Sequence, residues 1–137
     1  MKIPSGFPKP RALKDVLLWI SFLALATSAH AKPRISEFMA INDRALRDNL
    51  GNTSDWIEIE NPFATELSLQ GYYLTDNQEN LVKWQFPDVK IPPNGFLLVY
   101  ASNENLTDPN EPLHTNFTLR GEGEYIALVE PDGQTIA

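Results

Sequence analysis

His114 has the side chain best suited to catalysis, because imidazole titrates near neutral pH and can act as a general base or a zinc ligand. It is the only histidine between residues 32 and 137. A catalytic zinc site needs several nitrogen, sulfur or carboxylate ligands, and a serine triad needs a serine directed at the imidazole. The chain has no Gly-x-Ser-x-Gly turn to present such a serine. We therefore interpret His114, which follows Leu113, as a structural residue.

Glu58 and Glu60 stand two residues apart and could form the carboxylate pair of a glycosidase. Such a pair lies in a cleft, where burial raises the pKa of the acid. Here the glutamates alternate with Ile57 and Ile59, which is typical of the solvent-facing side of a strand at the edge of a small sheet. The chain has no cysteine, which excludes thiol catalysis, thiolate metal sites and iron–sulfur clusters. The sequence predicts no catalytic residues and no enzyme activity.

Residues 48–55 raise the hypothesis of a weak calcium site, because four oxygen-bearing side chains surround Gly51, namely Asp48, Asn49, Asn52 and Asp55. Calcium takes six to eight oxygen ligands, and only two of these four are carboxylates. The EF-hand spacing is absent. The alternative is that Asp and Asn favour loops because their side chains bond to nearby backbone. We favour this alternative and predict no metal ligand and no cofactor.

Seven aromatic side chains present a similar choice. Gathered on one exposed face they would form a platform on which sugar rings stack, whereas in a small sandwich they more often fill the core. We favour the core interpretation and keep carbohydrate binding as the lesser alternative. The seven are Trp56, Tyr72, Tyr73, Trp84, Phe86, Tyr100 and Tyr125.

The elements that would position these residues are strands, because short apolar and polar runs alternate with period two from residue 55 to 87. Residues 96–101 are apolar on both faces and are predicted to form the most buried strand. The Pro-Pro-Asn-Gly sequence at residues 92–95 predicts a turn before it. Further strands are expected at residues 113–119 and 125–129. The pattern predicts an all-β antiparallel sandwich of about seven short strands with almost no helix.

Within this sandwich the first strand is expected at residues 35–41, with Glu37 on the same face as Ile35 and with Phe38 on the other face. A short helical turn is expected at residues 45–47. The polar loop 102–112 is interpreted as a solvated connection, with ligand binding as the alternative. The predicted core consists of Ile35, Met39, Ile57, Ile59, Leu67, Leu69, Leu74, Phe86, Leu98, Val99, Ile126 and Leu128.

Several ordered blocks of the sequence resemble the lamin tail domain family. The likeness extends from Ile35 to Ile136 and is closest to the exported bacterial branch of that family. It implies an immunoglobulin-like β-sandwich, known in nuclear lamins and in extracellular modules of larger bacterial proteins, and it implies no catalytic residues. The blocks are Trp56-Ile57-Glu58-Ile59-Glu60-Asn61, Leu69-Gln70-Gly71-Tyr72-Tyr73-Leu74-Thr75-Asp76, Trp84-Gln85-Phe86-Pro87, Ile91-Pro92-Pro93-Asn94-Gly95, Phe96 to Tyr100 and Leu113-His114-Thr115-Asn116-Phe117-Thr118-Leu119.

Residues 1–31 have the three parts of a signal peptide: four basic residues before position 15, an uncharged apolar core at residues 16–26, and the small-x-small pattern Ala29-His30-Ala31. The core is too short to span a bilayer, so we expect cleavage after Ala31 and no membrane span afterwards. The protein is thus predicted to be secreted or held at the cell surface. Residues 32–137 then form a single domain.

The predicted mature chain is strongly acidic, with seven basic and seventeen acidic residues and a formal charge of −10. Such a chain repels phosphate backbones unless basic residues cluster, and only Arg44 and Arg47 lie close together. We expect no nucleic-acid binding. The partner would be an unknown protein or a component of the cell surface.

The sequence favours an exported, non-catalytic interaction or anchoring module. Residues 134–137 are expected to begin the partner strand of a hairpin whose turn is Pro131-Asp132-Gly133, and to stop short, as in a truncated domain. An alternative follows: the module would be the N-terminal accessory domain of a larger exported hydrolase or spore-coat-kinase-like enzyme, with its catalytic part beyond Ala137. Genomic DNA past codon 137 distinguishes the two.

Overall fold

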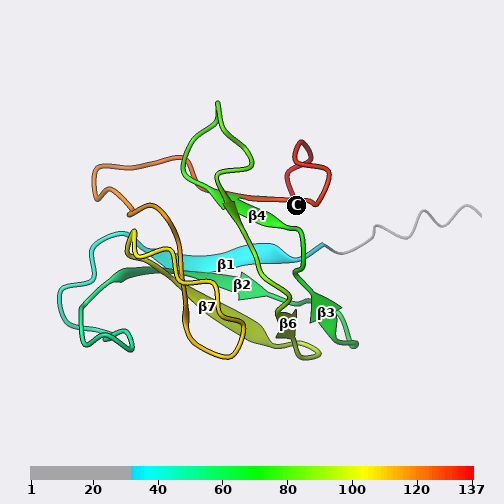
Figure 1. Ribbon diagram of the computed structural model, residues 1–137, viewed down its shortest axis with the longest axis horizontal. Coiled ribbons are helices and arrows are strands. Elements are labelled where there is room, and N and C mark those ends of the chain that lie inside the picture. The colour runs from blue at the N-terminus through cyan, green and yellow to red at the C-terminus, as the bar shows by residue number, and fades with distance from the viewer. Residues whose placement is uncertain (1–31) are drawn as a thin grey trace, which may run out of the picture. The chain divides into compact units, whose positions relative to one another are not determined.

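The computed structural model describes residues 32–137, so the predicted signal peptide, residues 1–31, lies outside the described residues. Residues 32–137 form nine strands and no helix, and the helical turn expected at residues 45–47 is absent (Figure 1). The same residues contain no helix with the length and hydropathy that a membrane crossing requires. The strands are β1 (Arg34–Met39), β2 (Asp55–Glu60), β3 (Leu67–Ser68), β4 (Tyr73–Thr75), β5 (Trp84–Gln85), β6 (Lys90–Ile91), β7 (Phe96–Ala101), β8 (Leu113–His114) and β9 (Ala127–Val129).

The first layer is a four-stranded sheet in the order β1-β2-β7-β8. β2 pairs antiparallel with β1 on one side and with β7 on the other. β8 runs parallel to β7, which departs from the fully antiparallel sheet that the sequence predicts. Because β2 is internal, the prediction that Glu58 and Glu60 lie on an edge strand is wrong. They lie on the outward face of an internal strand, and the alternation in β2 reports its faces but not its neighbours.

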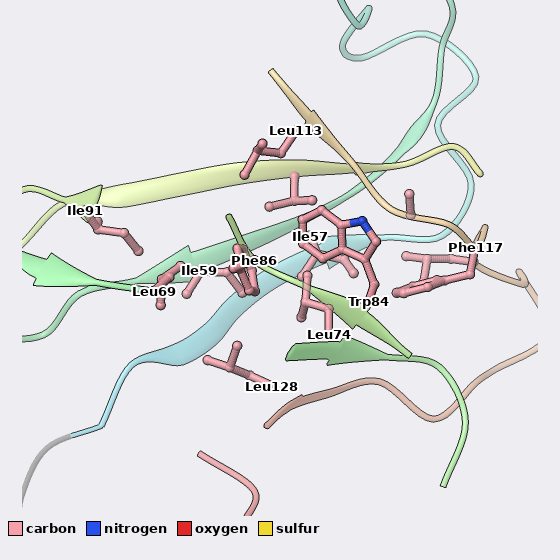
Figure 2. Packing of buried hydrophobic residues seen from close by; sticks show 13 residues of the cluster. Ile57, Ile59, Leu69, Leu74, Trp84, Phe86, Ile91, Leu113, Phe117 and Leu128 are labelled. Atoms are coloured by element: carbon pink, nitrogen blue, oxygen red, sulfur yellow. The ribbon is translucent and has the colours of Figure 1, made fainter. Parts of the chain in front are cut away.

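The second layer consists of a three-stranded sheet, β5-β4-β9, and the short pair β3-β6. Apolar side chains of both layers meet between them: Ile57 and Ile59 come from β2, while Leu74, Trp84 and Leu128 come from the three-stranded sheet (Figure 2). Two sheets packed over a shared apolar core make an immunoglobulin-like β-sandwich, as predicted. The fold is therefore held mainly by burial of this core.

The predicted core is largely correct, and all twelve positions are buried or half-buried. Met39 and Leu98 are the two that lie elsewhere, because they pair with Trp56 and Glu58 on the outward face of the four-stranded sheet. Several core residues were missed because they lie in two-residue strands or in loops, where no period can be measured. These are Ile91, Leu113, Phe117 and Leu119.

The predicted faces of the first strand are wrong because of a β-bulge at Ser36. The pairing shifts between Ile35, which lies opposite Ile59, and Glu37, which lies opposite Glu58. Adjacent residues of β2 point to opposite faces, so Ile35 and Glu37 do as well. The Ser36 hydroxyl at the bulge bonds to Glu58, at 2.6 Å from Oε1. The inserted residue keeps Ile35 in the core and sends the following glutamate outward.

β7 is buried only in its second half, so the prediction that it is the most buried strand is wrong. Phe96 is 54% exposed, whereas all three residues of β9 are buried. The outward face of β7 is covered near Tyr100, whose hydroxyl donates to Arg47 O at 3.2 Å in the loop 42–54. An apolar strand is fully buried only where both of its faces are covered.

The turn predicted at residues 92–95 is present, with Gly95 N–H donating to Pro92 O at 3.0 Å. Asn94 rather than the glycine takes the left-handed conformation, with φ of 51°. Gly95 is required for space, since a Cβ there would lie 2.7 Å from Pro92 Cγ. The tight turn delivers the chain directly into β7.

Candidate functional site

His114 lies at the centre of a polar cluster on the outward face of the four-stranded sheet. Its imidazole is fully buried. Nδ1 lies 2.7 Å from Ser102 Oγ, and Nε2 lies 2.7 Å from Asn49 Oδ1. Because an amide oxygen only accepts hydrogen bonds, Nε2 carries the proton and the Ser102 hydroxyl donates to Nδ1. We call Asn49, Ser102 and His114 the His114 cluster.

The His114 cluster has the connectivity of a nucleophile, a base and an orienting group. No sequence motif indicates this contact, since Ser102 precedes His114 without any recognisable turn motif. A general base must also pass its proton to the leaving group, so the edge of its ring must reach substrate. The buried ring of His114 has no such exposure. The burial and contacts of His114 therefore favour its structural interpretation.

The electrostatics of the cluster favour a neutral imidazole. Burial lowers the pKa of His114, and this effect outweighs the opposing influence of Asp48 and Glu104. A neutral ring keeps one donor and one acceptor, which matches Asn49 on one side and Ser102 on the other. The cluster thus attaches the loop 42–54 to β7 and β8.

The loop 42–54 is organised by Asp48. Its carboxylate accepts the N–H groups of Leu50 and Asn52 at 2.9 and 2.8 Å, and the Ser54 hydroxyl at 2.6 Å. Burial alone would raise the pKa of Asp48, but these bonds together hold it below its ordinary value. The contacts favour backbone bonding over calcium binding, because both oxygens of Asp48 already have partners inside the loop and Asn49 Oδ1 is bonded to His114. Within residues 32–137, no group of three His, Cys, Asp or Glu side chains is arranged to hold a metal ion.

A pocket of about 350 Å³ lies where three separate segments meet. The β4–β5 loop supplies Asp76 and Lys83, and the segment between β7 and β8 supplies Asn103. The segment after β8 supplies residues 116–118 and Arg120. The Ser102–Thr118 bridge and a 3.1 Å bond from Asn103 N–H to Phe117 O join two of these segments. We call this site the pocket.

The pocket contains polar groups whose bonding is incomplete. Lys83 Nζ pairs with Asp76 Oδ1 at 2.5 Å and lies 5.2 Å from the centre of the Phe117 ring. Asn116 Nδ2 donates to Lys83 O at 2.9 Å, while its buried Oδ1 has no hydrogen-bond partner. The Arg120 side chain is 83% exposed. A buried oxygen without a partner is costly, and here it lies beside a fixed ion pair.

The comparison with protein families decides what this sandwich is. The model of the Lamin Tail Domain matches residues 26–137, which include the whole of the predicted mature chain. The chain belongs to the lamin tail domain family. The family consists of non-catalytic immunoglobulin-like domains. No curated protein and no solved structure matches the chain.

In this lamin tail domain the paired glutamates do not form a glycosidase site. Glu60 accepts from Arg34 at 2.8 Å, and Glu58 accepts from the Ser36 hydroxyl. Both lie on the face of a sheet, half-exposed, rather than in a cleft. Surface contacts of this kind contribute little to stability and serve no catalytic step.

The aromatic residues of this lamin tail domain mostly build the core, as predicted. The tyrosines at 72, 73 and 125 are half-buried. Trp84 and Phe86 pack edge to face, with ring centroids 4.9 Å apart. The ring of Phe117 in the pocket is only 4% exposed and lies under Lys83. Four of the seven aromatics are buried and cannot stack on a ligand, which disfavours the alternative of a sugar platform; they are Trp56, Trp84, Phe86 and Tyr100.

Proposed function

We propose that residues 32–137 are a non-catalytic binding module that works outside the cytoplasm, either secreted or attached to the cell surface. The observation that carries the binding role is the pocket, where Asn116 Oδ1, an ion pair and an exposed arginine surround one hollow. Family membership supports a domain that binds rather than catalyses. The partner would be a protein or a cell-surface component.

The construction of the pocket also supports a binding role. Its lining comes from loops, which are the segments of immunoglobulin-like sandwiches that most often carry binding sites. Backbone bonds fix Asn103 to Phe117, and the Lys83–Asp76 pair fixes the β4–β5 loop side. A pocket that is organised before its ligand arrives loses less conformational entropy on binding.

Export is supported by the basic, apolar and small-residue parts of residues 1–31. The test is expression of the full chain in a bacterium with an intact secretion pathway. We expect the processed protein outside the cytoplasm, with Lys32 as its first residue by mass spectrometry. A chain that stays cytoplasmic and keeps Met1 would contradict export.

The binding role is tested by nuclear magnetic resonance with the purified domain, residues 32–137, and a library of small polar compounds. We expect bound compounds to shift the amide resonances of Asn103 and residues 116–120, and to be recovered chemically unchanged. Compounds that shift only other surfaces would contradict the proposed site. Conversion of a bound compound to a product would contradict the non-catalytic role.

A further inference from the structure

The pocket carries a cation whose outer edge is available to a ligand. Glu124 Oε2 accepts the backbone N–H of Arg120 at 2.9 Å, so that carboxylate is held by the main chain. Its other oxygen lies 3.8 Å from Nε of the Arg120 side chain. At this length, and with the side chain 83% exposed, the guanidinium keeps an edge open to solvent. Such an edge fits a planar carboxylate with two parallel hydrogen bonds.

The other cation in the pocket is less available. Lys83 is paired with Asp76 and lies over the Phe117 ring. Its charge is therefore balanced locally and its position fixed. This arrangement leaves Arg120 as the principal site for a negative group, with Lys83 as a secondary donor.

The neutral polar groups of the pocket indicate which hydrogen-bonding groups a ligand would carry besides its negative charge. Asn116 Oδ1 is buried and lacks a donor, so a hydroxyl or N–H group of a ligand that reached it would satisfy it. Asn103, with φ of 66°, and Thr118 line the same hollow. An unsatisfied acceptor next to an anion-binding edge suits a carboxylate with a hydrogen-bond donor nearby.

We propose that the pocket binds a small monoanionic carboxylate that bears a neighbouring hydroxyl or amide N–H, with Arg120 holding the carboxylate and Asn116 accepting from the donor. The inference rests on the proposed binding function and names its ligand class. The volume of about 350 Å³ suits one ring or one or two amino-acid residues. The domain charge of −10 disfavours polyanions, which it repels at a distance.

Two sources supply this chemistry: an acidic sugar and the carboxyl terminus of a peptide. Methyl β-D-glucuronide represents the first, N-acetyl-L-alanine the second, and methyl β-D-glucoside is the neutral control. Each is titrated into the domain, residues 32–137, while amide resonances are recorded. We expect a Kd of about 1 mM for at least one acid, with shifts at Asn103, residues 116–118 and Arg120.

Two variants with the same change of charge provide the control. Arg120→Gln removes the guanidinium from an exposed side chain and leaves the backbone N–H that holds Glu124. Lys90→Gln removes an exposed cation from β6, where its partner is Glu66 rather than any pocket residue. We expect binding about tenfold weaker in Arg120→Gln and unchanged in Lys90→Gln.

The possible outcomes distinguish a failure of the carboxylate assignment from a failure of the proposed binding function. Acid binding at the pocket that depends on Arg120 supports the inference, and the stronger of the two acids identifies the source. Equal binding of the neutral glucoside, or binding insensitive to Arg120→Gln, overturns the carboxylate assignment while the binding function stands. An absence of shifts with both acids also overturns the inference, and the wider compound screen then decides the proposed function.

Discussion

Ser102 and Asn103 are neighbours in the chain but belong to two regions of opposite character. Ser102 is part of the His114 cluster, where both ring nitrogens have a partner at 2.7 Å. Asn103, in the left-handed conformation, lines the pocket, where Asn116 Oδ1 has none. A polar cluster with all its hydrogen bonds made stabilises the position of a loop. A cluster with an unpaired acceptor can instead gain a hydrogen bond when a ligand binds. The completeness of hydrogen bonding therefore distinguishes structural residues from candidate binding residues, although neither region contains a catalytic motif.

The largest effect is expected in the core that supports both regions. Ile59 is fully buried, so Ile59→Ala should lower the free energy of unfolding by about 2–5 kcal/mol. Ile41, which is 64% exposed, is the matched control, and Ile41→Ala should cost less than about 0.5 kcal/mol. Urea denaturation measures both values. Equal losses would mean that the core has been wrongly assigned.

A smaller effect is expected where the loop 42–54 is organised. Asp48→Ala leaves two backbone N–H groups and the Ser54 hydroxyl without their acceptor, and should lower the free energy of unfolding by about 2 kcal/mol. Asp43→Ala changes an exposed carboxylate in the same loop and should have little effect. If both substitutions proved neutral in urea denaturation, the loop would not depend on Asp48.

The His114 cluster should make stability depend on pH. The folded-state pKa of His114 is below 6.5, so the unfolded chain binds the proton more readily. This contribution is complete above pH 6.5 and is lost as the pH falls through the folded pKa. Asp48, whose pKa is also lowered, adds a loss only at pH values below its ordinary pKa of 3.8.

Chemical denaturation between about pH 7.5 and pH 5 measures the His114 contribution, since no other histidine lies in residues 32–137. We expect the wild-type domain to lose stability on acidification and His114→Gln to lose less. Equal losses of stability in the wild type and in His114→Gln would contradict a buried neutral imidazole.

The smallest effect concerns calcium. Because Asp48 is already bonded inside its loop, the melting temperature should be equal in about 10 mM calcium and in EDTA at matched ionic strength. A site with a Kd of about 1 mM would instead add roughly 1.4 kcal/mol. For a domain of this size that corresponds to a rise of about 5–10 °C. A rise of that size would reinstate the calcium hypothesis.

The sequence predicted the sandwich well because its longer strands alternate with period two, as at Ile57 and Ile59. It failed at Ser36, where a bulge inserts one residue, and at residues 113–119, where the expected strand is only the two-residue β8. The parallel pairing of β7 with β8 has no local signal either. Patterns report which face a residue occupies but not which strand lies beside it.

The pocket was not predictable, because its residues come from three segments between positions 76 and 120 that only the folded chain brings together. Asp76 and Lys83 are ordinary loop residues in the sequence, and the missing partner of Asn116 is a property of packing. The structural role of His114 was predictable from the scarcity of other ligand residues, whereas its contacts with Ser102 and Asn49 were not.

The most direct test of the contrast between the two regions compares His114→Gln with Arg120→Gln. Each variant is titrated with N-acetyl-L-alanine and methyl β-D-glucuronide at about pH 7.5. Dispersed amide resonances show that each variant is folded. We predict that His114→Gln is less stable but binds the acid as the wild type does. Arg120→Gln should be as stable as the wild type but bind about tenfold more weakly. Binding abolished by His114→Gln in the folded domain, or retained in full by Arg120→Gln, would contradict this prediction.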